Sequence, residues 1–105
     1  MNIFRIGGHI GSVACLETKA GESFTVVAVG TNRSWKVSGE WVVNTDWHKV
    51  TFFGSLGARV KQECKPGMML VCEGSIHQGT FERGDGSRGC ATDLIADSAT
   101  WESVS

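Results

Sequence analysis

The sequence predicts an all-β domain in which five strands close into a small barrel, with one short helix between the third and fourth strands. The first observation is that apolar and polar residues alternate in several separate segments, because successive side chains of a strand point to opposite faces. The second is that 14 glycines and one proline in 105 residues suit tight turns better than a helical bundle. The length fits one domain with one core, so we expect residues 1–105 to form a single unit.

The first two strands are expected near the N-terminus. The first covers residues 2–11, with a continuation through residues 13–18, and places Phe4 and Ile10 on one face. The glycines at positions 7, 8 and 11 indicate a bend or bulge of the kind that small barrels use at their corners. The second strand, residues 24–31, is nearly continuous in apolar residues, which indicates that both of its faces are covered.

The middle of the chain is expected to form a long loop followed by the third strand. Residues 32–44 contain a polar interruption with Ser38 and Gly39, which predicts a hairpin loop. The third strand is then expected over residues 42–53, roughly. Its alternation puts Val50 and Phe52 on a face that suits a core.

The remaining elements complete the barrel. Ser55 is the expected N-cap of a helix over residues 56–64, and Pro66 with Gly67 ends that helix. Two further strands, residues 68–81 and 90–101, flank a glycine-rich loop at residues 82–89. Five strands with a helix between the third and the fourth give the layout of an OB-fold barrel.

The other face of the third strand has the character of a binding surface. It carries Trp47, Lys49, Thr51 and Phe53, so a lysine lies between two aromatic rings. Such a face can stack flat rings and neutralise phosphates, which is what a single-stranded nucleic acid offers. The alternative is a sheet face packed under a loop or another subunit, and the lysine argues against it because a charge is seldom buried without a partner.

Composition limits the other possibilities. A formal net charge of −1 argues against a protein that holds nucleic acid by bulk electrostatics, but not against one that relies on stacking. The four cysteines stand singly, so we expect no metal site and no cofactor, and we expect these residues to be small buried hydrophobes. No membrane-spanning run and no signal peptide are visible, so a cytoplasmic protein with no membrane contact is expected.

Five segments of the chain also carry a family resemblance. They are N-x(5)-G-x-I-G at residues 2–11, VGTNRSW at 29–35, TDWHKVTFFG at 45–54, PGMMLVCEGSI at 66–76 and ATDLIA at 91–96. In content and in order they resemble the bacterial single-stranded DNA-binding proteins, the SSB family. The resemblance covers nearly the whole chain, and the TDWH segment followed by KVTFFG is among its most specific parts.

The resemblance implies an OB-fold protomer that binds single-stranded DNA without strong sequence preference, by base stacking and by phosphate contacts from Lys and Arg. The stacking residues that it implies are Trp35, Trp47, Phe53 and Phe81, the last standing where the family usually has Trp. Lys36 and Lys49 match basic positions of the family. Arg83 and Arg88, in the glycine-rich loop, are further candidates for phosphate contacts, with a solvated loop tip as the alternative.

The family forms tetramers in most cases and dimers in some, so we expect a homo-oligomer and favour a tetramer. His48 matches a family histidine associated with subunit assembly. Met69 and Val71 put apolar side chains where a lone barrel would prefer polar ones, which fits a subunit interface; a covered core face is the alternative. The acidic tail with which the family recruits replication and repair proteins is not seen, so such partners stay open.

Two rival functions are weighed against a role in protecting and organising single strands during replication, recombination or repair. The chain could be a primosome accessory protein, a class that resembles a tail-less dimeric SSB and bridges helicase-loading partners. It could also be a small nuclease or thiol hydrolase, for which Asp46, His48 and Glu73 are the nearest acid–base candidates. No nucleophile motif or paired cysteine supports them, so no enzyme activity is expected.

Overall fold

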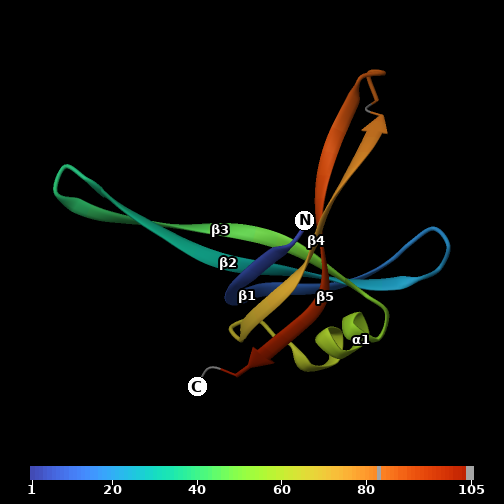
Figure 1. Cartoon of the computed structure of the whole chain (residues 1–105), viewed down its shortest axis with the longest axis horizontal. Coiled ribbons are helices and arrows are strands. Elements are labelled where there is room, and N and C mark those ends of the chain that lie inside the picture. Colours follow the sequence, from blue (N-terminus) through green and yellow to red (C-terminus); the bar gives the residue numbers. More distant parts are fainter. Residues whose placement is uncertain (83, 104–105) are drawn as a thin grey trace.

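A computed structural model describes residues 1–82 and 84–103 and contains five strands and one helix. In chain order these are β1 (Phe4–Glu17), β2 (Ser23–Val37), β3 (Glu40–Phe53), α1 (Gly54–Glu63), β4 (Met69–Glu82) and β5 (Arg88–Glu102). The strands close into a barrel in the order β1-β2-β3-β5-β4, with β3 and β5 parallel and the other pairings antiparallel. This is the predicted OB-fold, with α1 between β3 and β4 (Figure 1).

The core lies inside the barrel, where the inward side chains of all five strands meet. The residues with no exposed surface are Val27, Val29, Val50, Phe52, Val60 and Leu70. Helix α1 contributes Val60 to this core and lies close to the sheet, because a Cβ added at Gly57 would come 2.5 Å from the carbonyl oxygen of Phe52. The buried hydroxyl of Thr25 donates a hydrogen bond of 2.9 Å to the Gly57 carbonyl, which fixes the helix against β2.

Strand β1 bends at its glycines, as predicted. Its first half pairs with β4 and its second half with β2, and the register with β2 shifts between Ile10 and Ser12. At the bend, a Cβ on Gly8 would overlap the carbonyl of Gly30. Strand β1 can therefore pair with both β4 and β2, and so close the barrel, because glycines at the bend leave room for the neighbouring backbone.

The hairpin predicted at residues 32–44 is present, but the extent of its loop is wrong. Strands β2 and β3 stay paired until Val37 faces Glu40, and only Ser38 and Gly39 turn between them, with φ of 49° and 83°. Two positive φ values give the two-residue turn that matches the twist of a hairpin. Polar residues marked exposure in this stretch rather than the end of a strand, because its valines and tryptophans favour strand.

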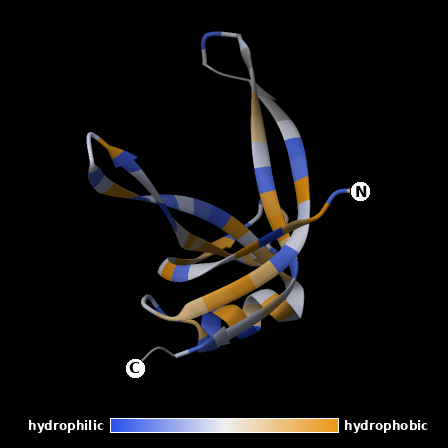
Figure 2. Cartoon of the chain, turned by 60° about the vertical axis from the view of Figure 1, so that its left-hand side comes forward, coloured by the Kyte–Doolittle hydropathy of each residue, from blue (hydrophilic) through white to orange (hydrophobic). Residues whose placement is uncertain are grey.

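We call residues 32–45 the hairpin arm, because every one of them is exposed and the pair of strands projects from the barrel (Figure 1). Figure 2 shows hydrophobic and hydrophilic residues interspersed along β2 and β3 out to the tip of this arm. Strands β4 and β5 pair from Met69 opposite Glu102 to Glu82 opposite Arg88, and the outer part of this ladder also projects from the barrel (Figure 1). The molecule accordingly extends over 51 × 38 × 28 Å.

Two local expectations also need correction. Helix α1 begins at Gly54, and its N-cap is Phe53 rather than Ser55, because the strand passes directly into the helix. Cys64 and Cys72 are buried as expected, whereas Cys15 and Cys90 are exposed. Among the described residues, no helix has the length and apolar character needed to cross a membrane.

Candidate nucleic-acid interface

Trp47 lies on the outer face of the barrel, above a bed of glycine backbone. It is opposite Gly30 in the β2–β3 ladder, and a Cβ added at Gly30 would come 2.8 Å from the Cζ3 atom of its indole. A Cβ at Gly11 of β1 would also overlap the same ring. The indole is therefore seated against β1 and β2, yet 57% of the residue is exposed, and it borders a shallow pocket with Ser12 and Ala28.

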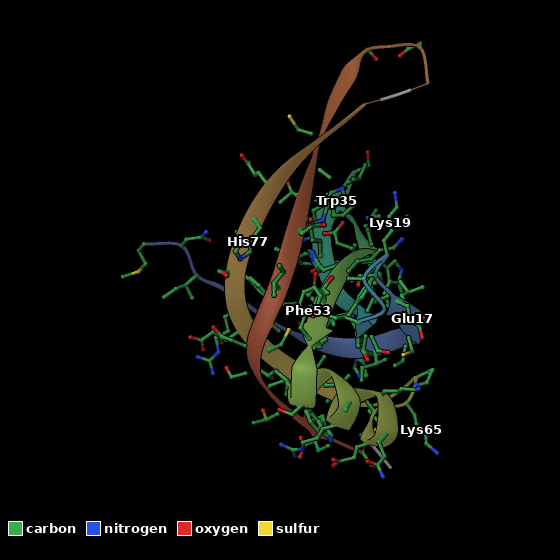
Figure 3. The ribbon with its side chains drawn as sticks, turned by 90° about the vertical axis from the view of Figure 1, so that its right-hand side faces the viewer. Glu17, Lys19, Trp35, Phe53, Lys65 and His77 are labelled. Carbon is green, nitrogen blue, oxygen red and sulfur yellow. The ribbon has the colours of Figure 1, made fainter. Side chains whose placement is uncertain are left out.

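Phe53 lies on the same face of β3, next to the start of α1 (Figure 3). Its ring is 5.5 Å from that of Phe24, its ladder partner, at an interplanar angle of 40°. The residue is nevertheless 42% exposed. Lys49, exposed and opposite Ala28, lies between the two aromatic residues, so the structure agrees with the predicted alternation along residues 47–53.

The charges of the ladder are divided between its two faces. Paired residues of an antiparallel ladder share a face, so the register over residues 24–37 and 40–53 assigns each side chain. The face of Trp47, which we call the ring face, carries Lys36 and Lys49 and no acidic residue within these two ranges. The opposite face carries Asp46, Glu40 and Arg33, so both acidic residues of these ranges lie away from Trp47, and a chain with a net charge of −1 keeps a basic, aromatic strip.

The structure brings Lys36 to the ring face but not Trp35. Trp35 is opposite Val42, which puts it on the other face of the ladder, where it is 40% exposed. There the guanidinium of Arg33 lies 5.4 Å from the centroid of the Trp35 ring and forms an ion pair of 2.6 Å with Asp46. Trp35, labelled in Figure 3, therefore lies on the face of the ladder opposite that of Trp47 and Phe53.

Trp41 and Arg33 are exposed residues to which the sequence reasoning assigned no role in binding. Trp41 lies on the ring face, opposite Lys36, whose Nζ is 5.7 Å from the centroid of its ring. The signal was present in the sequence, because Trp41, Trp47 and Phe53 are six residues apart, an even spacing that keeps them on one face of a strand. The expectation of a loop before the third strand hid that periodicity.

The glycine-rich loop joins β4 to β5. The predicted residue Arg83 lies outside the described residues, and so do the side chains of Phe81 and Arg88. At the tip of the loop, Asp85 accepts hydrogen bonds from the backbone N–H and the hydroxyl of Ser87, at 3.0 and 2.7 Å. These two hydrogen bonds lower the pKa of the Asp85 carboxyl.

The residues expected at a subunit interface lie in two places. His48 is half-buried on the face opposite Trp47, with its Nε2 atom 2.9 Å from the hydroxyl oxygen of Thr31. Met69 and Val71 are half-buried on the outer face of β4, where they line a shallow pocket with Thr100 of β5. The apolar character predicted for this part of the barrel surface is therefore present, but His48 belongs to a different strand pair.

The acid–base candidates of the enzyme alternative do not form a cluster. Asp46 is paired with Arg33, His48 with Thr31, and Glu73 lies on β4. Within residues 1–82 and 84–103, no group of three His, Cys, Asp or Glu side chains could hold a metal ion.

Comparison with known proteins agrees with this fold. The model of the single-strand binding protein family matches residues 1–101. A single-stranded DNA-binding protein of Xylella fastidiosa strain Temecula1 is 32% identical over 92 residues, which cover 86% of this chain and 56% of that protein. The mitochondrial single-stranded DNA-binding protein of Drosophila melanogaster is 28% identical over 99 residues, covering 92% of this chain and 68% of that protein.

A solved structure, described as Plasmodium falciparum SSB complex with ssDNA, superposes with a TM-score of 0.76. It is 17% identical, with 96% of this chain and 92% of that chain covered, and at this identity the likeness shows the fold alone. The chain spans 56% of the length of the first Xylella relative and less than half of a Xanthomonas campestris one. Because the family model matches almost all of its residues, the chain belongs to the single-strand binding protein family.

Proposed function

We propose that this protein binds single-stranded DNA without strong sequence preference, and that it thereby protects and organises exposed strands during replication, recombination or repair. One observation carries the proposal above the others. The indole of Trp47 is seated on glycine backbone while more than half of the residue stays open to solvent. A large ring held in place and left uncovered is a stacking platform for a base.

The ring face supplies both interactions that a single strand needs. Stacking of one base on an aromatic side chain contributes about 1–3 kcal/mol, and every base has a flat face, so this term is tolerant of sequence. Lys49 lies between Trp47 and Phe53 on the same face and can meet a phosphate while the neighbouring bases stack. Stacking therefore dominates binding, and the lysines of this face add a smaller electrostatic term.

The proposal is tested by titrating the protein with oligo-dT and following its tryptophan fluorescence. We expect quenching, because an indole that stacks on a base loses emission. Trp47→Ala should weaken binding about 5- to 150-fold, the equivalent of one stacked base, while the circular dichroism spectrum stays that of the parent. A folded Trp47→Ala variant with parental affinity would count against the assignment.

The proposed protein works as a homo-oligomer, a tetramer in preference to a dimer, with the Met69 and Val71 surface as one contact. If the ring faces of several subunits bound the same DNA strand, the overall affinity would rise, because every contact after the first would be intramolecular. Molar mass in solution, with and without poly-dT, tests the assembly. A stable dimer would favour the function of a primosome accessory protein instead.

The proposed role places the protein with DNA in the cytoplasm and requires no bond to be made or broken. Incubation of labelled single strands with the protein and Mg²⁺ or Mn²⁺ should leave the strands intact. Cleavage that persists in a purified sample, and that is lost in an Asp46→Asn variant, would contradict a pure binding role.

A further inference from the structure

The tip of the hairpin arm carries the most exposed of the four tryptophans. Trp41 is 67% exposed, whereas Trp47 is 57% exposed. In the described part of the chain, the ring of Trp41 meets the ammonium of Lys36, the residue opposite it in the ladder. Such a large ring, far from the core and without cover, adds nothing to the packing of the barrel and is available to a ligand.

We propose that Trp41 and Lys36 form a second stacking site for single-stranded nucleic acid, at the far end of the ring face. The inference rests on the function proposed for Trp47 and extends the track along which a strand lies. The two residues would take one base and its phosphate: the base on the ring of Trp41 and the phosphate at the ammonium of Lys36.

The positions along β3 support a continuous track. Trp41, Trp47 and Phe53 stand at equal intervals of six residues on one face. A β-strand rises about 3.3 Å per residue, so each interval is about 20 Å long and the three rings are spread over roughly 40 Å of β3. Val43 and Thr45 lie between the first two rings, both exposed, and neither is large enough to block a strand that passes over them.

The distribution of charge identifies the occupant as a polyanion. Over residues 24–37 and 40–53 the ring face has two lysines and no carboxylate, while Glu40 and Asp46 are confined to the opposite face. Lys36 lies 5.7 Å from the ring of Trp41, which leaves the rest of that exposed ring free for a base. A second copy of the chain that docked here would have to bring a matching acidic surface to this strip.

Oligonucleotides of two lengths distinguish the stacking site at Trp41 from the one at Trp47. Trp41→Ala should weaken binding to a dT oligomer of about 16 nucleotides by roughly 5- to 150-fold, the effect of one stacked base. An oligomer of about 2 to 3 nucleotides is too short to bridge the interval of about 20 Å between Trp47 and Trp41, so its affinity should change much less. Val37→Ala is the matched control, because Val37 is exposed at the same tip but lies on the opposite face.

A Trp47→Ala variant, measured in parallel, distinguishes failure of this inference from failure of the proposed function. If Trp47→Ala weakens binding and Trp41→Ala leaves the long oligomer unaffected, the second site is wrong and the first stands. If neither variant changes either affinity, the proposed function fails as well. A change in molar mass on Trp41→Ala would show that the arm contacts another copy of the chain, and would overturn the inference.

A direct readout comes from a variant that keeps Trp41 as its only tryptophan. Replacement of Trp35, Trp47 and Trp101 by Phe preserves a ring at each position. Addition of the long dT oligomer should quench the remaining fluorescence, and addition of the short one should quench it less. Emission that is unchanged at a saturating concentration of the long oligomer would overturn the second site.

Discussion

At the scale of single residues, the proposed site depends on two glycines, whose lack of a side chain makes room for an indole. Trp47 can rest on the sheet because Gly11 and Gly30 leave room for its ring, and a Cβ at either position would displace it. The sequence identified the tryptophan and a bend at Gly11. It could not link the two, because they meet only after β1 and β3 have folded onto opposite sides of β2.

Gly11→Ala should therefore impair the site without removing a ring. The added methyl group would push the indole of Trp47 off its bed, so we expect several-fold weaker binding to oligo-dT and a blue or red shift of the emission maximum as its exposure changes. Gly79→Ala is the control, because an added Cβ there meets open space. Parental affinity in a folded Gly11→Ala variant would show that the glycine bed does not position the ring.

The two buried cysteines should give the protein a pH dependence at alkaline pH. Burial raises the pKa of Cys72 from its usual 9.0 to about 11, and burial also raises the pKa of Cys64. Between pH 9 and 11 the unfolded chain loses a proton that the folded chain keeps, so the free energy of unfolding should fall as the pH rises through this range. Urea denaturation at several pH values measures the fall, and Cys72→Ala should reduce it.

At the scale of elements, the sequence predicted the order of strands and helix and the core faces of β3 and β4, because alternation reports which side chains are buried. It did not predict the length of β2 and β3. Beyond Thr31 neither face of the ladder is covered, so the apolar–polar alternation on which the prediction relied is lost. The arm is held by backbone pairing and by the turn at Ser38 and Gly39. The error concealed Trp41, since periodicity is only meaningful within a continuous strand.

The turn of the arm makes a prediction of its own. Ser38 has a φ of 49°, a conformation that Asn adopts more readily than Ser and that Pro cannot adopt. Hydrogen exchange of the arm amides should be slower in Ser38→Asn and faster in Ser38→Pro, with the barrel amides unchanged in both. Equal exchange in all three proteins would mean that the turn does not determine the stability of the arm.

At the scale of the whole molecule, a chain with a net charge of −1 presents a basic strip because the acidic residues of β2 and β3 all lie on the face opposite Trp47. Composition alone could not reveal this, since the sorting depends on register. A strand bound along the strip would meet few cations, so its affinity should depend on salt much less than that of a protein held by phosphate contacts alone.

This expectation can be measured as the slope of log K against log salt concentration. Each phosphate neutralised on a single strand contributes about −0.7 to the slope, so two to four contacts give a slope of about −1.4 to −2.8. Lys49→Gln should make the slope shallower by about 0.7 while fluorescence quenching persists, because the rings still stack. Lys61→Gln, an exposed position on α1, should leave the slope unchanged. If Lys49→Gln and Lys61→Gln behaved alike, Lys49 would not contact phosphate and the strand would have to follow another path across the barrel.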